Sequence, residues 1–210
     1  MPITDKGAAT RDLILDHAYA IASKKGLEGI SIGDLAQSVS MSKSGVFAHF
    51  GSREELQLAV LDLAGLRFGE AVLIPALRQP RGLKRLRAIV AAWLEWVRNN
   101  RDGCVIMGAT SEYDSQPGVL HDRVVALMGR WNADMTRAIS LAIDSGELAA
   151  GTDSRQLAFE ISGIAFALHH EIRLFDPKRV RVHAERAFER LIQANVAAES
   201  SGTARNPSRK

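Results

Sequence analysis

Three consecutive residues, Ser42, Lys43 and Ser44, place two hydroxyl groups and an ammonium group at the expected start of a short helix. The first turn of a helix has backbone N–H groups without intrahelical acceptors and a partial positive charge. Hydroxyl, ammonium and free N–H groups all bind the oxygen atoms of phosphate. Ser52 and Arg53 begin a second helix shortly afterwards. Together these residues predict a surface that binds a phosphate backbone.

Other reactive side chains do not have the spacing of a catalytic or metal site. They are the single cysteine, Cys104, the pair His121–Asp122 and the run His169–Glu171. Adjacent residues on a helix point about 100° apart, so His169 and His170 form a poor metal-binding pair. We therefore expect no enzyme activity, no metal and no cofactor, and a helical enzyme is only a remote alternative.

The residues that must position the phosphate-binding groups form a pattern of short helices. Ser31 and Ser42 are each placed to cap a helix, and Ser40 lies in the interruption between the two. Ser52 and Glu55 form a capping box for a third helix. The first helix has an apolar side, Ile32, Leu35, Ala36 and Val39, and the second has Val46 and Phe50. Two short helices joined by a few residues are a helix-turn-helix.

The run around these helices resembles the DNA-binding domain of the tetracycline-repressor (TetR) family of transcriptional regulators. The matching residues are Ser31, Asp34, Leu35, Ala36, Ser42–Lys43–Ser44, Val46–Phe47, His49–Phe50 and Ser52–Leu56, with Arg11, Ile14, Leu15, Ala18, Ile21 and Gly26 before them. The resemblance covers residues 9–60. Two positions depart from the family pattern. Ser40 stands where glycine is usual, so a left-handed backbone there would be strained, and Phe47 replaces the usual tyrosine.

The resemblance implies a regulator that binds an inverted-repeat operator as a dimer and is released by a small apolar effector. The DNA-binding candidates are Ser31, Ser42, Lys43, Ser44, Phe47, His49, Ser52 and Arg53. The last two helices, expected over residues 154–174 and 178–198, would pair with those of a second copy. Gly163, Ala165 and Ala167 are small enough for close helix approach, so a charge at Ala165 is predicted to split the dimer.

The rest of the chain predicts an all-α protein with a larger helical domain for effector binding and dimerisation. Helices are expected over 10–25, 53–74, 83–101, 103–113 and 119–145, with Pro75 ending the second of these. We expect a DNA-binding domain at 1–51 that begins with a flexible arm at 1–8. The effector domain is expected at 52–199, and a disordered basic tail at 200–210.

The effector candidates are large or polarisable residues that lie on the expected inward sides of their helices. They are Trp93, Trp96, Met107, Tyr113, Met128, Trp131, Phe166 and His169. Each of them also suits a plain hydrophobic core, and the sequence does not identify the effector. An activator, or a regulator controlled by a partner protein, remains an alternative to the repressor.

Bulk charge does not predict DNA binding. The net charge is +3, and the tail at 200–210 supplies three basic residues and no acidic one. Residues 1–53 carry six basic and five acidic side chains, so the DNA prediction depends on where charges lie. Residues 1–10 lack the apolar core of a secretion signal, and no apolar run is long enough to span a membrane. We expect a cytoplasmic protein.

Overall fold

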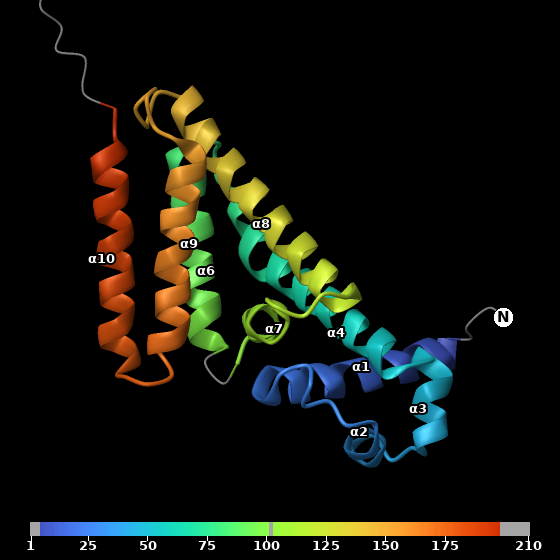
Figure 1. Ribbon diagram of the computed structural model, residues 1–210. Coiled ribbons are helices and arrows are strands. Elements are labelled where there is room, and N and C mark those ends of the chain that lie inside the picture. Colours follow the sequence, from blue (N-terminus) through green and yellow to red (C-terminus); the bar gives the residue numbers. More distant parts are fainter. Residues whose placement is uncertain (1–4, 101–102, 198–210) are drawn as a thin grey trace, which may run out of the picture.

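The computed structural model describes residues 5–100 and 103–197, and across them the all-helical prediction is confirmed (Figure 1). The elements are α1 (Asp5–Lys25), α2 (Ile32–Ser38), α3 (Lys43–Phe50), α4 (Arg53–Phe68), the π-helical segment η1 (Gly69–Leu73), α5 (Ile74–Leu77), α6 (Leu83–Asn99), α7 (Val105–Tyr113), α8 (Val119–Asp144), α9 (Ser154–Glu171) and α10 (Pro177–Asn195). The predicted tail at 200–210 lies outside the described residues.

Side-chain caps begin the helices where the sequence predicted them. Ser31, Ser42 and Ser52 each accept a hydrogen bond from a backbone N–H in the first turn of α2, α3 and α4. Asp153 and Asp176 do the same for α9 and α10. Such a cap stabilises a helix by about 0.5–2 kcal/mol relative to alanine. These helix starts therefore follow from local sequence.

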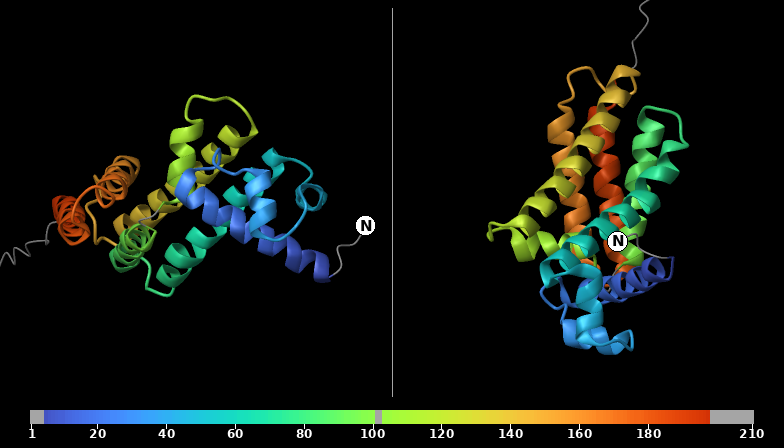
Figure 2. Two further views of the ribbon diagram at one scale, coloured as in Figure 1. Left: turned by 90° about the horizontal axis from the view of Figure 1, so that it is seen from below. Right: turned by 90° about the vertical axis from the view of Figure 1, so that its right-hand side faces the viewer.

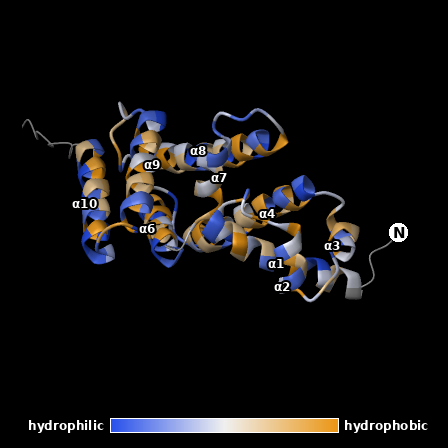
Figure 3. Cartoon of the chain, turned by 60° about the horizontal axis from the view of Figure 1, so that its bottom comes forward, coloured by the Kyte–Doolittle hydropathy of each residue, from blue (hydrophilic) through white to orange (hydrophobic). Residues whose placement is uncertain are grey.

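The helices α1, α2 and α3 form one end of the molecule, and α6, α9 and α10 form the other (Figures 1 and 2). Between them α4 and α8 run diagonally side by side, and α7 lies next to both. At the far end α9 packs against α10, α8 and α6. Polar and apolar residues both occur along α10 at the edge of the molecule, which fits a helix with one packed face (Figure 3).

Buried apolar side chains gather in two clusters. One joins α1–α4 with α7 and the first turns of α8, from Ile14 to Val124. The other joins η1, α5, α6, the rest of α8, α9 and α10, from Val72 to Ile192. Phe68, at the end of α4, packs against this second cluster. Because α4 and α8 contribute to both clusters, a shift of either helix would change the packing in both clusters.

Two helix predictions need correction. Pro75 does not end a helix, because it lies in the first turn of α5, directly after the wider turn of η1. Proline has no backbone N–H to donate, and the hydrogen bond directly before it, from Ile74 N to Gly69 O, is of the wider π-helical type. Residues 5–8 belong to α1 and not to a flexible arm.

Candidate DNA-binding surface and ligand cavity

Two buried residues on the inner side of α3, Val46 and Phe50, fix this helix against the first cluster. Its N-terminal turn and its opposite side face solvent, with Lys43 and Ser44 exposed and Phe47 42% exposed. Ser42 Oγ accepts from Gly45 N at 3.1 Å and lies 3.0 Å from Ser44 Oγ. The structure thus brings an ammonium group and two hydroxyl groups together at one exposed helix N-terminus.

The turn that orients α3 contains the strain expected at Ser40. Its φ is 55°, and it is the one non-glycine residue with positive φ among those described. The N–H of Met41 donates to Ala36 O at 2.8 Å, so the chain reverses directly after α2. A left-handed residue with a side chain costs roughly 1–2 kcal/mol. The backbone prediction at Ser40 is confirmed.

The other two serine candidates lie at helix starts on the same end of the molecule. Ser31 Oγ accepts from Asp34 N at 3.4 Å, and Ser52 Oγ accepts from Glu55 N at 3.0 Å. A hydroxyl that accepts one hydrogen bond can still donate its own proton. His49 lies in the last turn of α3 and is half-buried. Contact of these residues with DNA remains a prediction.

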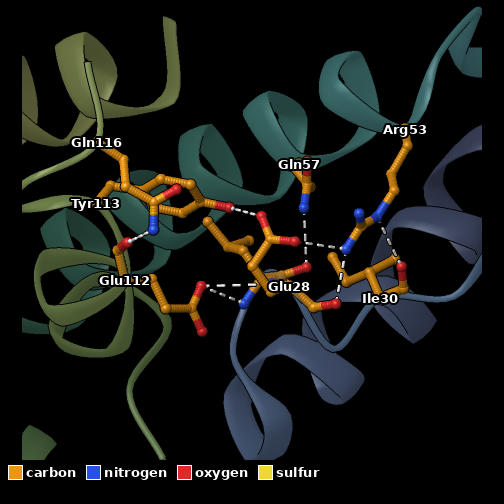
Figure 4. A network of polar contacts seen from close by, with 8 residues as sticks. Glu28, Ile30, Arg53, Gln57, Glu112, Tyr113 and Gln116 are labelled. Carbon is orange, nitrogen blue, oxygen red and sulfur yellow. Dashed lines mark hydrogen bonds and ion pairs between the residues drawn. The ribbon is translucent and has the colours of Figure 1, made fainter. Parts of the chain in front are cut away.

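Arg53 has a structural role that the sequence did not predict. Its Nε donates to Ile30 O at 3.0 Å, and its Nη2 donates to Glu28 O at 2.6 Å and to Glu28 Oε2 at 3.0 Å (Figure 4). Beside it, Gln57 Nε2 donates to Leu27 O at 3.0 Å. The start of α4 therefore holds the connection between α1 and α2, and the guanidinium group is already engaged within the chain.

We predict that Arg53→Lys lowers the free energy of unfolding by about 1–2 kcal/mol, because an ammonium group cannot reproduce this forked contact. Lysine keeps the positive charge, so the salt dependence of DNA binding should stay the same. Denaturant unfolding and DNA titration over a salt series measure the two effects. Arg78→Lys, at an exposed position after α5, is the matched control. Unchanged stability in Arg53→Lys would show that the fork does not hold the connection.

The same connection is bound from the other side by α7. Glu112 accepts hydrogen bonds from Leu27 N at 2.9 Å and Glu28 N at 3.3 Å, and Tyr113 OH donates to Glu28 Oε1 at 2.5 Å (Figure 4). The hydrogen bond from Tyr113 lowers the pKa of Glu28, and burial is the main cause that raises the pKa of Tyr113. A polar junction of Glu28, Arg53, Glu112 and Tyr113 thus joins the end formed by α1–α3 to α7.

A cavity of about 210 Å³ lies between α4, α6, α7 and α8. Five of the predicted effector residues line it: Trp93, Trp96, Met107, Met128 and Trp131. Three do not. Tyr113 belongs to the polar junction, Phe166 lines a separate groove between α8 and α9, and His169 is buried in α9 and is not among the lining residues. Contact of these three residues with an effector stays a prediction.

Sequence reasoning missed the part of the cavity wall that comes from α4 and η1. These residues are Asp62, Gly65, Leu66, Phe68, Gly69 and Leu73. The signal was present, because positions 62, 66, 69 and 73 follow helical spacing along one side of a helix that extends beyond the helix-turn-helix. This part of the wall could connect the cavity to the helix-turn-helix, since α4 runs from the cavity to Arg53.

The burial of His169 predicts that the stability of the protein depends on pH. It is 5% exposed, and burial lowers its pKa from 6.5 to about 4, with the charges of Arg173 and His170 acting in the same direction. At pH values between these two pKa values, His169 binds a proton in the unfolded chain but not in the folded chain. The free energy of unfolding should therefore decrease as the pH falls from about 6.5 towards 4.

Denaturant unfolding at several pH values in this window checks this prediction. His169→Gln should flatten the pH dependence, whatever it does to stability at pH 7. An exposed histidine on another helix provides the matched control, because His183→Gln, on α10, should keep the wild-type slope. A His169→Gln variant with the wild-type slope would assign the pH dependence to other groups.

Two family profiles match the chain. Residues 14–60 match "Bacterial regulatory proteins, tetR family", and residues 82–188 match "Tetracyclin repressor-like, C-terminal domain". The chain is also 33% identical over 46 residues to IcaR of Staphylococcus epidermidis, a negative transcriptional regulator of the biofilm operon icaADBC. That match spans 22% of this chain and only 25% of the length of IcaR.

Solved structures share the fold over nearly the whole chain. A TetR transcriptional regulator from Chloroflexus aurantiacus is 24% identical in sequence and has a TM-score of 0.77. The match covers 92% of this chain and 100% of that chain. AibR, solved with isovaleryl coenzyme A and operator DNA, is 21% identical in sequence and has a TM-score of 0.68. The match covers 89% of this chain and 98% of the AibR chain. With the second profile matching more than half of its length, the chain belongs to the TetR family of bacterial regulatory proteins.

Proposed function

We propose that the chain is a transcriptional repressor that binds an inverted-repeat operator as a dimer and releases it when a small effector enters the cavity. The observation that carries this proposal is the exposed N-terminal turn of α3, with Ser42, Lys43 and Ser44 on its surface. The description of IcaR as a negative regulator supports repression. The complex of AibR with a coenzyme A ester and operator DNA supports joint control by a small molecule and DNA.

In this proposal α3 enters the major groove, and its exposed residues divide into two roles. Lys43 and the hydroxyl groups of Ser42 and Ser44 contact phosphates, because a helix N-terminus favours anions regardless of base sequence. Phe47, on the exposed side of α3, offers an apolar surface suited to a thymine methyl group. Arg53 acts by holding the connection before α2 in place, since its hydrogen bonds lie within the chain.

The proposed dimer surface is the outer side of α9 and α10. Gly163 and Ala167 lie exposed on α9, and both line a shallow groove with residues of α10 that include Ala187 and Leu191. Phe159, also on α9, is 74% exposed. Such an apolar face on a two-helix layer is suited to burial against a second copy. Two copies related by a two-fold axis would present two α3 helices to two half-sites.

The division into a DNA-binding part at 1–51 and an effector and dimerisation part at 52–199 belongs to the same proposal. DNA binding would place the protein in the cytoplasm. Within residues 5–100 and 103–197, no helix combines the length and the apolar character needed to cross a membrane.

The proposal is tested by the salt dependence of DNA binding. Each phosphate contact contributes about 0.9 to the slope of log affinity against log salt concentration. Lys43→Ala should therefore reduce the slope by roughly 1.8 in a dimer, with a duplex enriched from a random-sequence library as the probe. Lys84→Ala, at an exposed position on α6, removes the same charge away from α3 and should keep the slope. If the Lys43→Ala slope equals that of Lys84→Ala, Lys43 does not contact the backbone.

A further inference from the structure

The outward side of α9 carries a row of exposed residues at intervals of four positions. The helix packs against α10 on one side and against α8 on the other (Figure 1), and a groove lies along each of these contacts. Gly163, near the middle of α9, lines both grooves. Residues four apart form one continuous row on a helix surface. The members of the row are Arg155, Phe159, Gly163, Ala167 and Glu171, and all five are exposed.

This row is complementary to itself about Gly163. A basic and an acidic residue, Arg155 and Glu171, lie eight positions before and after it, and Phe159 and Ala167 lie four positions before and after it. A two-fold axis through Gly163 and perpendicular to the row would place the row of a second copy on this one in the reverse direction. Each arginine would then face a glutamate, and each large phenylalanine a small alanine. Two helices that cross at about −50° bring such rows parallel to each other, so the pairing agrees with a common mode of helix packing.

The single chain does not account for the two charged ends of the row. Neither Arg155 nor Glu171 forms an ion pair with another described residue. Sixteen positions separate them, which is roughly 24 Å along the helix, so they cannot pair with each other within one chain. Arg155 lies in the first turn of α9 and Glu171 is its last residue, whereas the helix dipole favours acidic groups at the start and basic groups at the end. A second copy would supply the missing partner for both charges.

The apolar middle of the row points to the same partner. The side chain of Phe159 is 74% exposed, which is a large apolar surface for a residue inside a helix. A Cβ atom built on Gly163 would have nothing within 4 Å. Alanine is more favourable than glycine inside a helix, so neither packing within the chain nor helix formation requires glycine here. Close approach of a second backbone does require it.

We propose that the dimer forms through an antiparallel contact between the two α9 helices, centred on Gly163, with Arg155 of each copy paired with Glu171 of the partner subunit. Charge and size complementarity along the row select a second copy of this chain as the occupant of the surface. This inference rests on the dimer of the proposed function and specifies its contact surface and its register.

Exchanging the charges tests the register. Arg155→Glu places glutamate opposite glutamate, and Glu171→Arg places arginine opposite arginine, at both ends of the contact. Each single variant should raise the dimer dissociation constant at least about 10-fold, because like charges repel across an interface. An equal mixture of the two variants should form a heterodimer about as stable as the wild-type dimer, since every arginine again faces a glutamate. The helix dipole favours both substitutions, so both variants should fold. Sedimentation velocity over a concentration series measures each dissociation constant.

A larger side chain at the crossing provides a second test. Gly163→Met should fold, because the space around this position is open in the single chain, but the added side chain should hold the two helices apart. The dimer dissociation constant should again rise at least about 10-fold, since both copies carry the obstacle. Gly129→Met is the matched control, because Gly129 is exposed on α8 and a Cβ atom built there also has nothing within 4 Å. This control should keep the wild-type dissociation constant.

The outcomes separate the register from the proposed function. A wild-type dimer whose charge variants dissociate no more readily than the wild type, or whose mixture does not recover affinity, overturns the register and leaves the dimer on another face. A wild type that is monomeric at every concentration overturns the register together with the proposed dimer. If the exchange behaves as expected but the protein binds no DNA, the α9 contact stands and the repressor function fails. Thermal unfolding identifies any variant that does not fold, and the remaining variants then decide.

Discussion

Replacing Gly103 with alanine is expected to destabilise the protein by about 2–6 kcal/mol. Gly103 has a φ of 153° and lies directly on the backbone of α1. A Cβ atom built there would come within 1.4 Å of Ser23 O and 2.6 Å of Ser23 C. Backbone atoms cannot move aside as a flexible side chain can. The alanine variant must therefore separate α1 from the chain that leads into α7, besides adopting a conformation that favours glycine.

Thermal unfolding measures this effect. For a chain of this length about 1 kcal/mol corresponds to roughly 2–4 °C, so the melting temperature should fall by roughly 4–24 °C. Gly108→Ala is the matched control, because Gly108 lies in α7 and nothing is within 4 Å of a Cβ atom built there. Alanine favours a helix over glycine by about 1 kcal/mol, so this control should keep or raise the melting temperature. A Gly103→Ala variant that melts like the wild type would show that α1 and this connection are not in contact.

Placing a glutamate at Ala167 is expected to dissociate the proposed dimer. A buried unpaired charge costs several kcal/mol, which is at least about 100-fold in the dimer dissociation constant. Glu171, one turn further along α9, lines the same groove and would add repulsion. DNA affinity should fall as well, because a single α3 helix reaches only one half-site.

Sedimentation velocity over a concentration series gives the oligomeric state directly. Ala126→Glu, at an exposed position on α8, adds the same charge outside the proposed dimer surface and is the control. A folded Ala167→Glu variant that sediments like this control would place the interface elsewhere. The charge is no longer placed at Ala165, because that residue is 2% exposed and lines the cavity, so Ala165→Glu would act on folding.

This correction at Ala165 shows how far helical spacing can be used. Gly163 and Ala167 are four residues apart and lie on one side of α9, whereas Ala165 is two residues from each and points about 200° away. The spacing alone therefore separated the three residues into two faces. Which face met the core could not be decided locally, because it depends on how α6 and α8 pack against α9.

Local rules were sufficient wherever a few neighbouring residues decide the backbone. The caps at Ser31, Ser42 and Ser52, the strained turn at Ser40 and the exposed start of α3 involve groups close together in the chain. Their hydrogen bonds span only three to five residues, so residue type and spacing predict them. For the same reason the family pattern could be identified in the sequence, and the all-helical fold with it.

The tertiary structure decided which side chains meet across distant parts of the chain. Arg53 holds the connection before α2, and Tyr113 reaches Glu28 instead of the cavity, because α4 and α7 pack on opposite sides of that connection. Phe68 joins the tryptophans only because α4 runs beside α8 as far as η1. An amphipathic helix specifies that one face is buried but not which partner covers it. The sequence therefore determined the helices and the DNA-binding end, and packing between helices determined the cavity and the polar junction.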